Sequence, residues 1–130
     1  MAAPLIPASI EVCESQASDD QIKLMSCRNL STVYDALRDV QSALIGVINQ
    51  PRCEDDNRDE NAAGAYLESL LERMNREVEC IVDAAQSRTD AVMHEAYERA
   101  LLLIKHEVNC GSGLPEIAAL AAGLAVTQKH

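Results

Sequence analysis

The chain of 130 residues contains no phenylalanine and no tryptophan, and aromatic residues make up only 2% of it. Its hydrophobic residues, 48% of the total, are therefore almost all aliphatic or sulfur-containing. Sheet cores depend on aromatic and β-branched side chains, whereas Leu, Ala and Met pack well between helices. The composition predicts an all-α protein, and the length predicts a single domain with a core of its own.

Basic residues are also scarce. The chain has 11 Lys and Arg against 21 Asp and Glu, a formal net charge of -10. A surface that binds nucleic acid needs cations to displace counterions from the phosphates, so we expect no direct nucleic-acid partner. The same charge permits a basic protein partner, or a surface that imitates nucleic acid and blocks a nucleic-acid-binding protein. Most acidic chains, however, are simply soluble proteins whose charge has no specific binding role.

Signals for secretion and for membrane insertion are missing as well. No Lys or Arg precedes Lys23, so the start lacks the basic region of a signal peptide. The longest apolar run after the start covers residues 117–126, about half of what a bilayer requires. The five cysteines are odd in number and form no Cys-x-x-Cys pair, which is typical of reduced thiols. We expect a cytoplasmic protein with no membrane partner.

Catalytic motifs are absent. The sequence has no glycine-rich phosphate loop, no nucleophile elbow, no His-Glu-x-x-His and no Glu-x-x-His of a di-iron bundle. We therefore expect a protein that is not an enzyme and has no cofactor. His106 and Cys110 could present two ligands to one metal from the same helix face. Cys53, Cys80 or His94 would have to complete that site, so we assign no metal ligand and keep a metal-binding bundle as a third alternative.

Helical periodicity begins after residues 1–18, a proline-containing stretch that we expect to form a flexible or docked arm. Ser18 is a suitable N-cap for a helix beginning near Asp19. From Leu30, apolar residues recur with alternating spacings of three and four, which predicts a coiled-coil-like stripe that Pro51 ends. Their positions are Leu30, Val33, Leu37, Val40, Leu44 and Val47. The segment before Asn29 is either a separate short helix or a second contact face.

After a polar loop with Asp59 as the expected N-cap, residues 62–108 form one very long helix or two helices joined near Ser87. A single straight helix would be roughly 70 Å long, about twice the diameter of a compact domain of this size. Ser87 and Asp90 resemble a capping box, which favours a fold-back there. The alternative is a straight helix whose uncovered half is buried by a second copy.

The two parts of this segment differ. Residues 62–86 have one apolar face, which includes Tyr66, whereas apolar residues cover nearly half the circumference of 92–108 and predict at least two packing neighbours. The polar face of 92–108 comprises His94, Glu95, Glu98, Lys105 and His106, with Leu102 as an exposed residue among them. Gly111 predicts a left-handed helix end, and Pro115 begins a short Ala-rich helix to about Thr127.

Together these patterns predict a small antiparallel bundle of about three main helices and a short C-terminal helix in one domain, residues 19–130, with dimerisation as a further way to bury its apolar faces. The function that fits best is binding of another protein through apolar helix faces and an acidic surface, as an adaptor, chaperone or regulator, and we expect a homodimer. The expected partner or dimer interface consists of Tyr97, Leu101, Leu102, Ile104, Ile117, Leu120 and Leu124.

Overall fold

The computed structural model describes residues 19–88 and 93–128, with side chains placed through 19–88 and 95–124. Residues 19–24 form a short helix. The named elements are α2 (Cys27–Ile48), the 3-10 helix η1 (Pro51–Cys53), α3 (Ala62–Gln86), α4 (Met93–Asn109) and α5 (Leu114–Gln128). Within these ranges the chain is helical, apart from its loops and a single β-bridge between Glu54 and Glu60. The predicted all-α bundle is confirmed, whereas the arm and its Ser18 cap lie outside the described residues.

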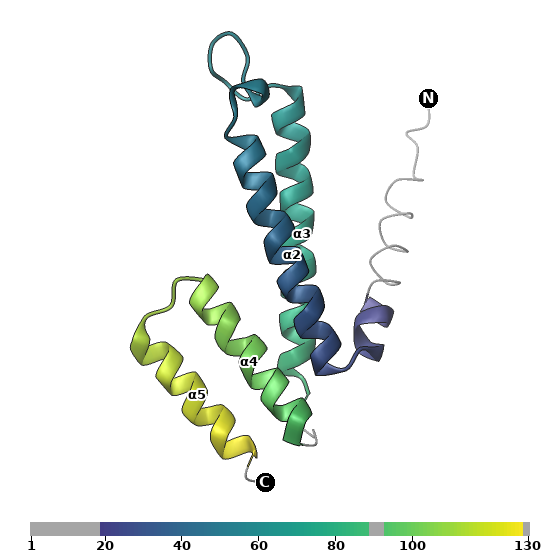
Figure 1. Ribbon diagram of the computed structural model, residues 1–130, viewed down its shortest axis with the longest axis vertical. Helices are drawn as coiled ribbons and strands as arrows, with labels where there is room; N and C mark the ends of the chain where they lie inside the picture. Colours follow the sequence, from purple (N-terminus) through teal and green to yellow (C-terminus); the bar gives the residue numbers. More distant parts are fainter. Residues whose placement is uncertain (1–18, 89–92, 129–130) are drawn as a thin grey trace, which may run out of the picture.

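The long antiparallel hairpin of α2 and α3 is the frame of the molecule (Figure 1). We call the end that holds the start of α2 and the end of α3 the proximal half, and the end that holds the connecting loop the distal half. Helix α4 packs on the proximal half against both hairpin helices, and α5 packs chiefly on α4. The helix of residues 19–24 lies on the opposite side of the same half. The distal half is therefore only two helices thick.

Both ends of α2 follow the local sequence. Ser26 is the N-cap and its side chain accepts a hydrogen bond from the Asn29 amide at 3.1 Å, which separates α2 from the helix of residues 19–24. Gln50 is extended, with φ -84° and ψ 151°, as expected for a residue before proline. The predicted end of this helix at Pro51 and the separate short helix before Asn29 are both confirmed.

The loop into α3 differs from the prediction in its cap. The N-cap is Asn61, not Asp59, and its side-chain oxygen accepts from the Gly64 amide at 2.9 Å. The Asn61 amide also donates to the carbonyl oxygens of Arg52 and Glu54, so this side chain closes the loop as well as the helix. Asp59 instead donates its backbone N–H to the Asp55 carboxylate. Asn61 is the N-cap because its side chain forms hydrogen bonds both with the start of α3 and with the carbonyls around η1.

The long apolar segment does fold back. Helix α3 ends at Gln86 and α4 begins at Met93, and the two helices pack together. Ser87 has a different role from the predicted one: it is the C-cap of α3, and its hydroxyl donates to the Ala84 carbonyl at 2.9 Å. Asp90, the other residue of the predicted capping box, lies outside the described ranges. The position of the break was right, but Ser87 belongs to the helix that ends there.

The turn between α4 and α5 has the predicted chemistry. Gly111 has φ +78°, the left-handed conformation that glycine adopts without strain. The Ser112 amide then reaches back to the Glu107 carbonyl at 3.1 Å, which closes the last turn of α4. No helix within the described ranges has both the length and the apolar character to cross a membrane.

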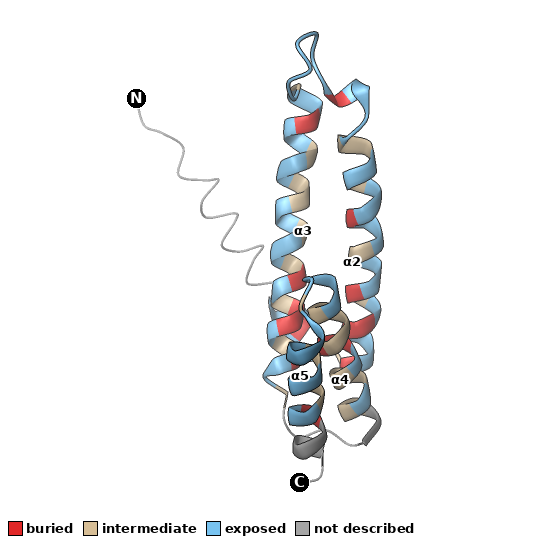
Figure 2. Ribbon diagram, turned by 90° about the vertical axis from the view of Figure 1, so that its left-hand side faces the viewer, coloured by how far each residue is buried: buried red, intermediate tan, exposed pale blue. Residues whose placement is uncertain are grey.

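The hydrophobic core lies in the proximal half, as the burial colours show (Figure 2). It joins the short first helix, both hairpin helices, α4 and α5. Its buried members are Ile22, Leu30, Tyr34, Val78, Ile81, Val82, Ala85, Leu102, Leu103 and Leu124. In the distal half, by contrast, Val40 is 49% and Tyr66 65% exposed, although both lie on predicted apolar faces. The periodicity identified these faces, but it did not indicate which half of each would be covered.

Charged side chains from α4, together with Arg88 just after α3, close the helix ends in the proximal half. The Glu95 carboxylate accepts a hydrogen bond from the Cys27 amide at 2.7 Å, at the positive end of α2. Arg99 donates to the carbonyls of Ala85 and Gln86 at the end of α3, and Arg88 donates to those of Ile22, Lys23 and Met25. Each charge complements the helix dipole that it meets, so the helices are fixed relative to one another by more than apolar contact.

Candidate functional site

An exposed apolar stripe runs along α4. Tyr97 is 62% exposed, Leu101 37% and Val108 56%, with the half-buried Ile104 between them. Their spacings of four, three and four place all of these side chains on one helix face. We call Tyr97, Leu101, Ile104 and Val108 the α4 stripe. Contiguous apolar residues on a surface, as opposed to single ones, are typical of an interaction site.

Helix α5 lies beside α4 and lacks a polar face. From Leu114 to Leu124 its only charged residue is Glu116, and the exposed positions include Ala118, Ala119 and Ala122. Leu124, which is 7% exposed, and the partly buried Leu120 hold α5 against the core. A helix that is apolar around its whole circumference normally has neighbours on several sides. Because α5 packs mainly on α4, its outer side extends the apolar surface of the α4 stripe.

The predicted interface residues divide into accessible and inaccessible ones. Tyr97 and Leu101 are exposed, and Ile104, Ile117 and Leu120 are half-buried. Leu102 is fully buried and Leu124 nearly so, so neither is available to a partner in this structure. The prediction that Leu102 is exposed was wrong.

The error over Leu102 has a physical cause. Three of its polar neighbours on the helical wheel, Glu95, Lys105 and His106, contact α2 and lie around Leu102 where the two helices pack. Lys105 pairs with the Asp35 carboxylate at 3.0 Å and also donates to the Ser31 hydroxyl. Glu95, from the same face, binds the start of α2. In the sequence, a charged helix face is indistinguishable from a solvated one, because periodicity does not reveal partners on other helices.

Tyr34 on α2 is the clearest example of a polar contact between α2 and α4. It is completely buried, and its hydroxyl accepts a hydrogen bond from the Asn109 amide at 2.8 Å. The same hydroxyl lies 3.3 Å from His106 Nδ1, and the two rings meet edge to face. Buried tyrosine hydroxyls need such partners. His106, a predicted member of the wet face, is therefore part of the packing between α2 and α4.

The possible metal pair consists of His106 and Cys110 on α4 and just after it. Cys110 Sγ lies 3.4 Å from His106 Nε2, as the spacing of the two residues predicted. Cys53 is buried at the distal loop, on η1, and Cys80 is on α3. Within the described ranges no group of three or more His, Cys, Asp or Glu residues is arranged to hold a metal ion. The His94 side chain and Cys13 lie outside what the structure describes.

The thiols of Cys27 and Cys80 have raised pKa values. Burial raises the pKa of the Cys27 thiol, and its hydrogen bond with the Glu95 carboxylate raises that pKa further. Burial likewise raises the pKa of Cys80, aided by the nearby charges of Asp19 and Glu77. A raised pKa lowers the thiolate fraction and hence the reactivity of the sulfur. These cysteines have the properties of structural residues and not of nucleophiles.

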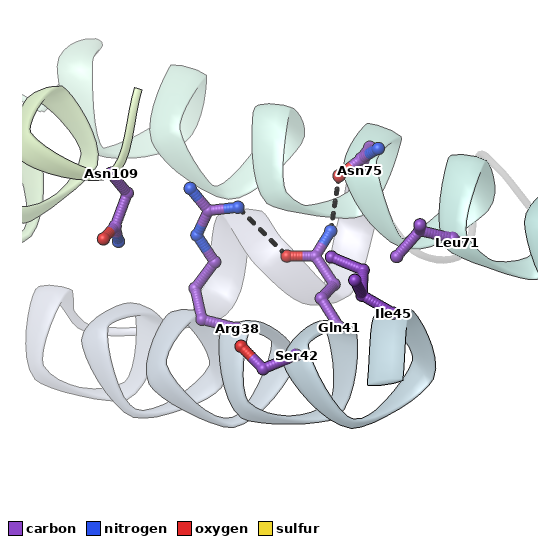
Figure 3. A pocket seen from close by; sticks show the side chains of 7 residues that line it. All are labelled: Arg38, Gln41, Ser42, Ile45, Leu71, Asn75 and Asn109. Carbon is purple, nitrogen blue, oxygen red and sulfur yellow. Dashed lines mark hydrogen bonds between the residues drawn. The ribbon is translucent and has the colours of Figure 1, made fainter. Parts of the chain in front are cut away.

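A polar groove of about 310 Å³ opens where α4 ends and the hairpin continues (Figure 3). Gln41 on α2, only 3% exposed, accepts from Arg38 Nη1 at 3.1 Å and donates to Asn75 Oδ1 on α3 at 2.5 Å. The sequence reasoning missed this residue. A signal was present, because Gln41 is seven positions after Tyr34 and seven before Ile48, in line with the buried side of α2. A single polar residue in such a line commonly fixes the register of two helices.

The exposed outer face of α3 carries mixed charges. Glu68, Glu72, Glu79 and Asp83 lie on this face, as predicted, and Arg76 stands in the same row between Glu72 and Glu79. This face is therefore acidic but not uniformly so.

Comparison with known proteins adds no assignment: no protein-family model, no curated protein and no solved structure matches this chain. The function must accordingly be inferred from the fold and from the surfaces described above.

Proposed function

We propose that this chain is a non-enzymatic helical interaction protein, an adaptor, chaperone or regulator, that binds another protein through the α4 stripe and α5. The observation that supports this most directly is the exposure of Tyr97, Leu101 and Val108 in one row. The adjoining side of α5 adds Ala118 and Ala122, whose small side chains allow a second helix to approach closely. This surface suits the apolar face of a partner's helix.

The charge of the chain indicates what should surround that apolar face on the partner. The net charge is -10, and Glu98 and Glu116 belong to the two helices that form the surface. Lys and Arg residues at the rim of the partner would be attracted by this field and would speed association. The partner that fits is therefore an amphipathic helix with basic edges. We place this interaction in the cytoplasm, with no membrane, cofactor or nucleic acid involved.

A second candidate is an inhibitor that imitates nucleic acid. It draws support from the carboxylates of Glu68, Glu72, Glu79 and Asp83 along α3. We rank it second because Arg76 interrupts the row, and because it leaves the α4 stripe without a role. It predicts binding that weakens steeply with salt, whereas an apolar contact is far less sensitive.

The leading proposal is tested by affinity capture from a lysate of the source cells with the immobilised full-length chain. Leu101→Glu places a charge in the middle of the α4 stripe at a position that is already 37% exposed, so the fold should tolerate it. Ser69→Glu is the matched control, since it adds the same charge at an exposed position on α3.

We expect a protein whose capture falls at least about tenfold with Leu101→Glu, the effect of burying an unpaired charge in an apolar contact, and is unchanged with Ser69→Glu. Capture that is equal for both variants and the unmodified chain would contradict the proposal. Capture that disappears in high salt but ignores Leu101→Glu would favour the second candidate.

A further inference from the structure

The polar groove beside the end of α4 contains an arginine without an acidic partner. Among the described residues that line it, none is Asp or Glu (Figure 3). Arg38 forms no ion pair within residues 19–88 and 95–124, and Asp35, one turn before it, pairs with Lys105 at 3.0 Å instead. Glu72 and Glu79 lie on the exposed outer face of α3. The groove is therefore a positively charged patch in a chain whose net charge is -10.

Arg38 is held in place by two neighbours. Its guanidinium lies 5.7 Å from the centre of the buried Tyr34 ring, a cation–π contact. Its Nη1 donates to Gln41 Oε1 at 3.1 Å. Because arginine can only donate, Gln41 must turn its oxygen to Arg38 and its nitrogen to Asn75. Gln41 is 3% exposed and bound at both ends, so Arg38 is oriented before a ligand arrives, which lowers the entropic cost of binding.

The Arg38 guanidinium keeps donors for a further partner. Gln41 takes one hydrogen of Nη1, which leaves the parallel N–H groups of Nε and Nη2. Figure 3 shows the second terminal nitrogen pointing away from Gln41. Two parallel donors match the two oxygens of a carboxylate in a charge-assisted, bidentate pair. A single guanidinium balances one negative charge, so a carboxylate fits this groove better than a phosphate dianion does.

The distal end of the groove is apolar. Ile45 comes four residues after Gln41, and Leu71 comes four residues before Asn75, so both lie one turn further along the hairpin. Figure 3 shows them beyond Gln41, at the end away from Arg38. Ile45 is 48% exposed and Leu71 is half-buried. Arg38 and Ile45 are about 10 Å apart along α2, a span that a carboxylate with a chain of about six carbons covers.

We propose that this groove binds a small aliphatic carboxylate. The carboxylate pairs with the Arg38 fork, and the chain passes Gln41 and packs against Ile45 and Leu71. The groove volume of about 310 Å³ is at the lower end of the range for small-molecule sites, which favours a ligand of this size. The groove includes no residue of the α4 stripe, so this proposal and the proposed function can fail independently.

An NMR titration of the full-length, ¹⁵N-labelled chain with hexanoate tests the proposal, at a physiological ionic strength that screens the net charge. A ligand with about eight non-hydrogen atoms should bind with a dissociation constant of about 1 mM. Saturable shifts are expected in residues 38–45 and 71–75 and in the side-chain amides of Gln41 and Asn75. Hexanol lacks the charge, hexylamine reverses it and acetate lacks the chain, so each should bind at least about tenfold more weakly.

Substitutions of Arg38 test the role of its guanidinium. Arg38→Gln keeps a donor for Gln41 but removes the charge, and it should raise the dissociation constant for hexanoate at least about tenfold. Arg38→Lys keeps the charge without the fork and should weaken binding several-fold. Arg28→Gln is the matched control, since it removes the same charge at an exposed position of α2 and should leave binding unchanged.

An internal competitor tests the same site without removing Arg38. Ser42→Glu places a carboxylate one turn after Arg38, where it can occupy the fork, and should abolish hexanoate binding while glutamate maintains the helix. Ala43→Glu adds the same charge at the next exposed position, outside the groove lining, and should bind hexanoate as the unmodified chain does.

Four results would refute the proposal. They are the absence of saturable hexanoate binding up to about ten times the expected dissociation constant, shifts centred on the α4 stripe instead of the groove, equal affinity for hexanol, and binding that survives both Arg38→Gln and Ser42→Glu. The amide spectrum of each variant shows whether its fold is retained.

Discussion

The two halves of the α2–α3 hairpin are built from the same helices but differ in how they are stabilised. In the proximal half, three further helices cover the hairpin, and Leu30, Tyr34 and Leu102 are completely buried. In the distal half the same apolar periodicity continues, yet Val40 remains half exposed and the buried centre is the polar Gln41. Periodicity makes a helix face apolar; only long-range packing decides whether that face becomes core or surface. On the hairpin helices themselves, it is the distal half that leaves this face at the surface.

The largest expected difference between the halves is in stability. Leu102→Ala removes a fully buried side chain from the proximal core and should lower the free energy of unfolding by about 2 to 5 kcal/mol. Val40→Ala, in the distal half, should cost less than about 1 kcal/mol in the monomer, because half of the side chain is already in water. Urea unfolding of both variants, under conditions where the chain is monomeric, measures the contrast. Equal losses would mean that the two halves do not differ as described.

A pair of glycines sharpens the comparison within the distal half itself. An added Cβ at Gly64 would lie 2.9 Å from the Cys53 carbonyl and 2.8 Å from Glu60 Cγ, where the start of α3 touches η1. Gly64→Ala should therefore cost about 1 to 3 kcal/mol, since a backbone atom must move.

Gly46 is the matched control for that substitution. A Cβ there meets nothing within 4 Å, so Gly46→Ala should stabilise α2 by about 0.5 to 1 kcal/mol through its better helix propensity. Thermal unfolding gives the melting temperature of each variant. A decrease for Gly64→Ala and an increase for Gly46→Ala would establish that the distal loop is closely packed. A neutral Gly64→Ala would show that η1 can shift freely.

The parts of the fold that the sequence predicted are those with local causes. Pro51, Ser87 and Gly111 act within a few residues, and each marks a real boundary. The burial of Leu102 and the contacts of Lys105 and His106 depend on residues about 70 positions away, which one helical wheel cannot represent. Of the candidate site, Tyr97 and Leu101 could be recognised as surface residues once two neighbours had covered the rest of α4. The exposure of Val40 could not be predicted, because a coiled-coil-like pattern looks the same whether or not another helix covers it.

The smallest expected effect compares two buried thiols, one in each half. Cys27, at the proximal end, is 1% exposed, and Cys53, at the distal loop, is 3% exposed, so static burial hardly distinguishes them. Alkylation of a buried thiol in the native protein requires local opening, which costs less where fewer apolar contacts must be broken. The Cys53 thiol should therefore be labelled several-fold faster than Cys27, and the raised pKa of Cys27 acts in the same direction because it lowers the thiolate fraction. Mass-spectrometric mapping after brief exposure to iodoacetamide gives the two rates, with the exposed Cys110 as the fast reference. If Cys27 reacted as fast as Cys53, the proximal half would open as readily as the distal one, and the contrast in covering helices would have no counterpart in local stability.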